Sequence, residues 1–152
     1  MYKCEILADS ISPQGHRITT YKVTYPRIIH AEMCRHRTLS RNSASSRAIP
    51  FKKMVQMVEE DPFIPIAWQK DHKGMQGTEY ITDSYHSKVC QEDWLAARDA
   101  AILSAIRLNS GFHTLKEAEA PIEEGREDRV TKQLCNRLLE PFMWHTELIT
   151  LS

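Results

Sequence analysis

The sequence predicts an α+β protein in which a small antiparallel sheet packs against helices. Three observations favour this class. Residues 17–25 alternate like a half-buried strand, residues 83–109 repeat apolar side chains at helical spacing, and both patterns occur within one chain of 152 residues. A chain of that length suits one compact unit, so a single domain over residues 1–152 is expected.

Two strands are expected at the start of the chain, at residues 3–8 and 17–25. The second is rich in β-branched and aromatic residues, which favour strands. One of its two faces carries Thr19, Tyr21, Val23 and Tyr25. The intervening SISPQGH has turn chemistry, so the two strands are expected to pair as a hairpin.

A short amphipathic helix is expected over residues 27–36, because Pro26 suits its first turn and Ile29 and Met33 share one side. Residues 38–49 are rich in Ser and Asn, whose side chains compete with the backbone for hydrogen bonds. This segment is therefore expected to be an ordered, irregular loop. Pro50 opens a second helix, which should stop before Pro62.

The second half of the chain begins with a long connection over residues 62–82, rich in Pro and Gly. The clearest helix follows at 83–109, with Gly111 as its expected stop. The remaining elements follow from charge, periodicity and the break at Pro141: a charged loop at 112–127, a helix at 128–139 and a strand at 142–151.

Composition excludes several classes of protein. The chain has 20 basic and 20 acidic residues, whereas broad nucleic-acid binding usually shows as a basic excess. It contains no apolar run long enough to span a membrane, and its first residues do not resemble a signal peptide. The four cysteines are widely spaced, so free thiols in a reducing cytoplasm are expected.

The segment RHRTLSRNSASSR, which starts at Arg35, concentrates guanidinium, hydroxyl and amide groups. Guanidinium groups are planar, bidentate donors to phosphate, and Ser and Asn add neutral donors and acceptors. The mixture suits an anionic, nucleotide-like ligand. A solvated loop after a helix C-terminus, where basic residues complement the macrodipole, would have a similar composition.

The order of these residues resembles the signature of the flavin-dependent thymidylate synthases. That signature is matched by Arg35, His36, Arg37, Ser40, Asn42, Ser45 and Arg47. The patches LADSISPQGHRITTYKVTYPR, SRNSASSRAIPFKK, KGMQ and KQLCNRLLEPFMWHT are similar to a phage-type branch of the family. The chain departs from the pattern at Glu32, Ser43 and Ala48, and it lacks the C-terminal helical segment that family members carry after the final strand.

The resemblance implies reductive methylation of dUMP to dTMP, with FAD as cofactor and methylene-tetrahydrofolate and NADPH as co-substrates. It assigns FAD to Arg35, His36, Arg37 and Asn42. It assigns dUMP and catalysis to Ser45 and Arg47, since a fixed guanidinium stabilises negative charge in the uracil ring. It also implies a homotetramer with active sites at subunit interfaces, and a location in the host cytoplasm for a phage protein.

Further substrate contacts are expected from Lys132 or Arg137, on a helix that in relatives reaches a neighbouring subunit's substrate. A plain charged surface would look the same. No metal is expected: His30 and Cys34 are four residues apart, but no further ligand pair follows, and Cys34 is interpreted as a core residue.

Three other functions fit the same sequence. The first is a phage relative that modifies another pyrimidine nucleotide. The second is a nucleic-acid-binding module that uses Arg35, Arg37, Arg41 and Arg47 as a phosphate stripe, against which the neutral net charge counts. The third is a non-catalytic fragment that keeps only the fold.

Overall fold

A computed structural model describes residues 1–74, 77–111 and 129–152. The charged loop expected at 112–127 and the last two residues of the KGMQ patch lie outside the described residues. In chain order the elements are β1 (Lys3–Ile11), β2 (Arg17–Pro26), η1 (Arg27–Ile29), α1 (His30–Met33), β3 (Ser40–Ser43), η2 (Ser46–Ala48), α2 (Phe51–Glu60), α3 (Ser84–Asn109), α5 (Lys132–Leu139), η3 (Glu140–Phe142) and β4 (Trp144–Leu151), where η marks a 3-10 turn.

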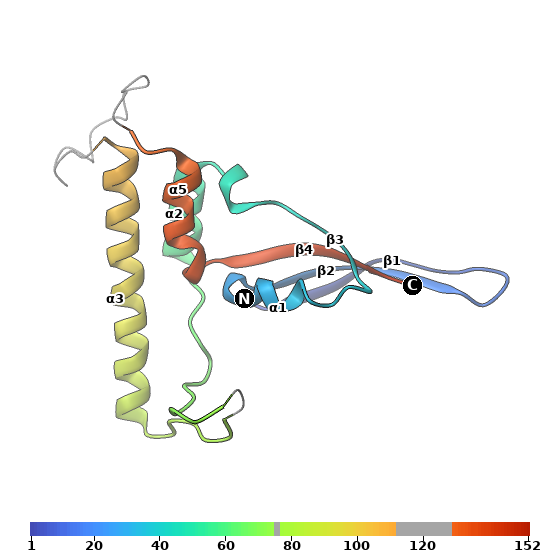
Figure 1. Cartoon of the computed structure of the whole chain (residues 1–152), viewed down its shortest axis with the longest axis horizontal. Coiled ribbons are helices and arrows are strands. Elements are labelled where there is room, and N and C mark those ends of the chain that lie inside the picture. The colour runs from blue at the N-terminus through green and yellow to red at the C-terminus, as the bar shows by residue number, and fades with distance from the viewer. Residues whose placement is uncertain (75–76, 112–128) are drawn as a thin grey trace.

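The expected α+β class is confirmed. The strands form one antiparallel sheet in the order β1-β2-β4-β3. Figure 1 shows this sheet extending away from a layer formed by α2, α3 and α5. The β1–β2 hairpin forms where turn chemistry predicts it, and Gly15 adopts the positive φ of 86° that the turn requires.

Alternation along the two central strands decides which side chains the sheet buries. Tyr25 on β2 lies opposite His145 on β4, and both are buried. Two residues further along β4, Glu147 is buried on the same face, because successive side chains of a strand point to opposite sides. The buried face of the sheet is therefore unusually polar at this place.

The irregular loop expected at 38–49 is partly wrong, because Ser40–Ser43 forms the edge strand β3. Ser, Asn and Arg have little intrinsic preference for strands, so the pairing with β4 overrides local composition. The helix expected over 27–36 is also shorter than predicted, since η1 and α1 together end at Met33.

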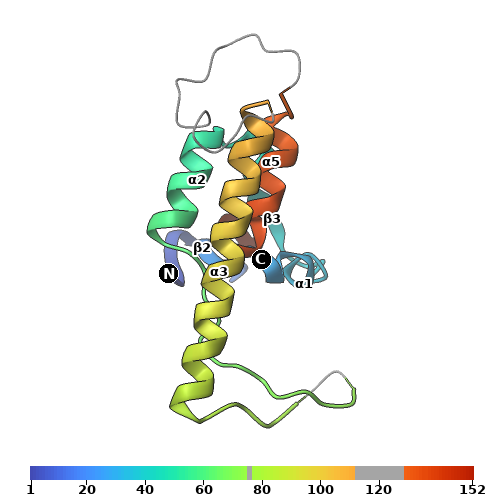
Figure 2. The same ribbon diagram turned by 90° about the vertical axis from the view of Figure 1, so that its left-hand side faces the viewer.

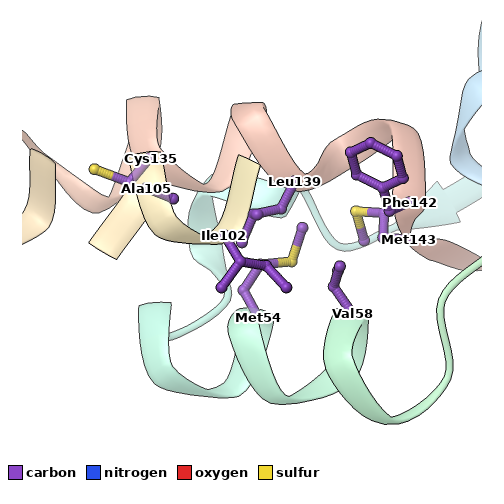
Figure 3. Close-up of a cluster of buried hydrophobic side chains, with 8 residues drawn as sticks. All are labelled: Met54, Val58, Ile102, Ala105, Cys135, Leu139, Phe142 and Met143. Atoms are coloured by element: carbon purple, nitrogen blue, oxygen red, sulfur yellow. The ribbon is translucent and has the colours of Figure 1, made fainter. Parts of the chain in front are cut away.

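The hydrophobic core lies between α2, α3 and α5 and continues into η3 and the start of β4. Figure 2 shows the three helices side by side. Figure 3 shows the buried side chains that they share, namely Met54, Val58, Ile102, Ala105, Cys135, Leu139, Phe142 and Met143. Helix α3 begins where Asp83 accepts a hydrogen bond from the backbone of His86 at 2.9 Å, as an N-cap should. Within the described part, no helix is apolar and long enough to cross a membrane.

Candidate functional site

The segment with Arg35, His36 and Arg37 forms an exposed turn directly after α1. Arg41 holds this turn in place: its guanidinium donates to the carbonyl oxygens of Met33, of Cys34 at 3.0 Å and of His36 at 3.3 Å. Met33 is the last residue of α1, and Cys34 and His36 lie in the turn that follows, so Arg41 contacts the C-terminal end of the helix and the turn together. Arg41 therefore has a structural role that the sequence pattern did not reveal.

The rest of the segment leads from the sheet to the helices. Asn42 is exposed on β3 opposite Leu148, and Ser45 and Arg47 are exposed at the start of η2 and within it. Ser46, rather than Ser45, is the buried hydroxyl of this stretch, and it donates to Glu140. Figure 1 shows β3 running from the edge of the sheet towards the helical layer, where η2 follows.

Helix α5 fastens η2 to the core through Asn136. This fully buried side chain donates to the backbone oxygens of Ser46 at 2.8 Å and Ile49 at 2.9 Å. Lys132 and Arg137 lie on the exposed side of the same helix, as expected. The structure thus brings Arg47 and the expected substrate-binding helix into one neighbourhood.

Several guanidinium groups around this neighbourhood have no partner among the residues that the structure describes. Those of Arg35, Arg37, Arg47 and Arg137 make no hydrogen bond or ion pair with any residue that the structure describes. A free, exposed guanidinium keeps all of its donors available for a phosphate or a carboxylate.

A buried polar cluster lies beside the segment and was missed by sequence reasoning. It consists of Tyr25, His30, His145 and Glu147. The Tyr25 hydroxyl lies 2.8 Å from His30 Nδ1 and donates to Glu147, while Arg41 Nε lies 3.8 Å from the other carboxylate oxygen. The sequence pattern that could have predicted the cluster is the HTE stretch of the final strand, because alternation along a strand puts His145 and Glu147 on the same, buried face.

Burial and nearby charge keep this cluster's histidines neutral. Burial, the neighbouring His30 and Arg27 lower the pKa of His145 from 6.5 to about 4. Burial first, and then Arg27, lower the pKa of His30 as well. Burial and the bond to Glu147 raise the pKa of Tyr25, so the phenol keeps its proton.

The same cluster has a partial metal-ligand set, because ligand atoms of His30, His145 and Glu147 lie within 4.8 Å of one another. The Tyr25 hydroxyl, however, already contacts both His30 Nδ1 and Glu147. Arg27 Nη1 lies 3.5 Å from His145 Nδ1, which adds positive charge beside the cluster. Hydrogen bonding accounts for these contacts better than a divalent cation would.

A hollow of about 320 Å³ opens next to the cluster. It is lined by Arg27, Ile28, His30, Ala31, Glu140 and Pro141. Arg27 Nη2 lies 3.8 Å from Glu140, the same carboxylate that accepts from Ser46. The hollow therefore shares His30 with the buried cluster and is linked to the basic segment through the Ser46–Glu140 hydrogen bond.

Solved structures of a nucleotide methylase share this architecture. They are structures of PolB from Streptomyces cacaoi, a UMP/dUMP methylase, to which this chain is similar in fold. Its structure with 5-Br UMP matches 100% of this chain and 72% of PolB, with a TM-score of 0.65 and 15% identity. The structure with 5-Br dUMP matches 92% of this chain and 51% of that one, with a TM-score of 0.55 and 16% identity. At this identity the likeness concerns the fold.

The expected membership of the flavin-dependent thymidylate synthases is wrong. No protein-family model matches the chain, and no curated protein does. The matching folds are those of a UMP/dUMP methylase. In this chain two residues that lie between the matched positions stabilise the fold: Arg41 contacts the C-terminal end of α1, and Ser46 connects η2 to η3. A short match in such a segment does not fix a family.

Proposed function

We propose that this chain binds a uridine monophosphate, in its ribo or deoxy form, and methylates the pyrimidine ring. Two features support binding of a small anion: exposed guanidinium groups in the basic segment that have no partner among the described residues, and a hollow of about 320 Å³ linked to that segment through Ser46 and Glu140. That volume lies within the range of roughly 300–1,000 Å³ of small-molecule sites. The fold shared over the whole chain with a UMP/dUMP methylase supports a uracil nucleotide as the ligand.

In this proposal Arg47 and Ser45 bind the nucleotide. Arg47 supplies a bidentate contact to the phosphate, or stabilises negative charge that develops in the ring during methylation. Lys132 and Arg137, exposed on α5, add positive charge from the same chain or from a neighbouring copy. Arg27 and His30 line the hollow that would receive the base.

FAD remains the proposed cofactor, with NADPH and methylene-tetrahydrofolate as co-substrates. The chain offers groups that fit a dinucleotide, because Arg35 and Arg37 are exposed and their guanidinium groups are unused. They would hold its phosphates, with His36 and Asn42 beside them. A bound flavin would supply the reducing equivalents that turn a transferred one-carbon unit into a methyl group.

The binding step is tested by titrating UMP, dUMP and uridine into the protein in a calorimeter. We expect both nucleotides to bind and Arg47→Ala to weaken them roughly tenfold or more, since a charge-assisted contact contributes about 1.5–3 kcal/mol. Uridine, which lacks the phosphate, should bind weakly. Arg107→Ala removes the same side chain from α3 and should leave both affinities unchanged.

A different pattern would reject the proposal. If UMP and dUMP do not bind, while a DNA oligonucleotide binds with a steep dependence on salt, the nucleic-acid module is favoured instead. The cofactor is tested separately by the visible spectrum of purified protein after addition of FAD. If an absorption band at about 450 nm stays with the protein through gel filtration, a flavin site is supported. Complete loss of the band argues against such a site.

A further inference from the structure

His30 and Cys34 lie at the two ends of the single turn of α1, on the same side. Cys34 Sγ is 3.5 Å from His30 Nε2, within the range of a hydrogen bond to sulfur. We infer that this pair is a nucleophile and its base, of which His30 also lines the hollow. A thiol within reach of an imidazole, which a third group orients in turn, is the arrangement that activates cysteine nucleophiles.

The orienting group is the Tyr25–Glu147 pair. The Tyr25 hydroxyl donates to Glu147, so its oxygen is free to accept from His30 Nδ1–H, 2.8 Å away. This assigns the proton to Nδ1 and leaves the lone pair on Nε2, which faces Cys34 Sγ. Glu147 is held in turn by Arg41, at 3.8 Å.

The surroundings suit a base that starts neutral. Burial first, and then Arg27, lower the pKa of His30, so the imidazole is unprotonated near neutral pH. The ring of His145 lies 4.3 Å from that of His30, centroid to centroid, and carries no hydrogen bond at its buried Nε2 within the described part of the chain. A neutral His30 has a lone pair that can accept the thiol proton, and the carboxylates of Glu147 and Glu140 favour the imidazolium that then forms.

Exposure distinguishes Cys34 from the other thiols. Cys34 and Cys4 are exposed, Cys90 is half-buried and Cys135 is buried. Of the two exposed thiols, Cys34 alone has an imidazole within 4 Å among the described residues. Its earlier interpretation as a core residue is wrong, because α1 ends at Met33 and leaves position 34 on the surface.

The matching substrate class is a carbon made electrophilic by conjugation to a carbonyl. For the uracil ring this carbon is C6, an identification that rests on the function proposed above. The S–H proton passes to His30 Nε2 as the Sγ–C6 bond forms. The C5=C6 electron pair then moves onto C5 and the C4 carbonyl oxygen, which prepares C5 for a methyl group. Elimination reverses the addition, so no oxidant or reductant is needed for this step.

Alkylation with iodoacetamide, followed residue by residue with mass spectrometry, tests the pair in the whole protein. At pH 7 we expect Cys34 to react at least roughly fivefold faster than Cys4, because His30 Nε2, 3.5 Å from Sγ, can accept the thiol proton as the new bond to sulfur forms. His30→Asn should bring the two rates together. Cys135 is the internal folding control, since a buried thiol reacts only if the variant unfolds.

Equal alkylation rates at Cys34 and Cys4 in the folded wild-type protein would overturn the assignment of His30 as the base of Cys34. A Cys34-to-Cys4 rate ratio that His30→Asn leaves unchanged would overturn it too. If Cys135 reacts in His30→Asn, Tyr25→Phe replaces it, because this variant removes only the hydroxyl that orients His30. A lower alkylation rate of Cys34 in folded Tyr25→Phe supports the role of Tyr25 in orienting His30, and an unchanged rate rejects it. His86→Asn, at an exposed position on α3, is the matched control.

Added nucleotide separates this inference from the proposed function. Saturating dUMP or UMP should slow alkylation of Cys34 and leave Cys4 unaffected. Binding of nucleotide without protection would reject uracil C6 as the electrophile. If no nucleotide binds while Cys34 remains fast and dependent on His30, the proposed function fails and the nucleophile–base pair stands.

Discussion

Glu147 is the residue on which the buried polar contacts of the sheet converge. Its carboxylate accepts from Tyr25 and lies 3.8 Å from both His30 Nδ1 and Arg41 Nε, although its side chain is only 1% exposed. A buried carboxylate costs several kcal/mol unless hydrogen bonds and opposite charge compensate for lost water. Here Tyr25 and Arg41 provide that compensation, from opposite sides of the carboxylate.

His145 should make the protein less stable in mild acid. Its pKa is lowered to about 4 when folded, mainly by burial, and returns to about 6.5 on unfolding. Between these values the unfolded chain binds the extra proton, so stability is complete above pH 6.5 and falls as pH drops towards 4. This difference corresponds to a loss of about 3 kcal/mol. His30, shifted in the same direction, adds to it.

Urea unfolding between pH 7.5 and 4.5 measures this dependence. Wild-type protein should lose stability steadily below about pH 6.5, and His145→Gln should flatten the curve. His86→Gln, on the exposed start of α3, should leave the curve as steep as in wild type. A wild-type free energy of unfolding that is constant over this range would contradict the assignment of His145 as a buried neutral group.

Helix α5 connects the basic segment to the core, and Asn136 makes that connection. Its amide nitrogen donates to two backbone oxygens of the η2 region. Asn136→Ala should lower the free energy of unfolding by about 2–3 kcal/mol, because it removes two side-chain hydrogen bonds to backbone oxygens at a fully buried position. Gln133→Ala, exposed on the same helix, should change it by less than about 0.5 kcal/mol. Equal changes in the free energy of unfolding for the two variants would show that the hydrogen bonds of Asn136 do not stabilise the protein.

At the scale of elements, periodicity located most of the fold. Helix α3 and strand β2 follow the predicted ranges closely. Strand β3 was not predictable from Ser and Asn, since it depends on pairing with a strand more than a hundred residues away. The early end of α1 was missed for a related reason, because Arg41 caps it from outside the helix.

The candidate site was predictable only in part. Sequence order located the exposed cations Arg35, Arg37 and Arg47, whose guanidinium groups have no partner in residues 1–74, 77–111 and 129–152. It did not locate the cluster around Glu147, because Tyr25 and Glu147 come from separate strands that meet only in the folded sheet. The hollow between η1, α1 and η3 likewise exists only once these segments pack.

Large apolar side chains are exposed on two elements of the described chain. Every residue of β1 is exposed, including Ile6, Leu7 and Ile11, and α3 exposes Tyr85 and Leu103. Figure 1 shows α3 continuing beyond the ends of α2 and α5. Exposed apolar surface of this kind is a candidate for an interface with another chain.

We therefore expect the chain to assemble as a homotetramer. Light scattering coupled to gel filtration should give four times the monomer mass of 17.6 kDa. Placing a charge in the apolar surface, as in Leu103→Glu, should shift the mass towards smaller species, whereas Glu92→Gln on the same helix should not. A monomer at tens of micromolar wild-type protein would contradict the expectation.

The central claim is that the basic segment and the adjacent hollow bind a uracil nucleotide. The most direct test is a crystal structure of the whole protein with 5-bromo-dUMP, with the bromine located by its anomalous signal. The account predicts a bromine in the hollow lined by Arg27 and His30, and a phosphate in contact with Arg47. A nucleotide bound elsewhere, with Arg35, Arg37 and Arg47 still facing solvent throughout the assembly, would contradict it.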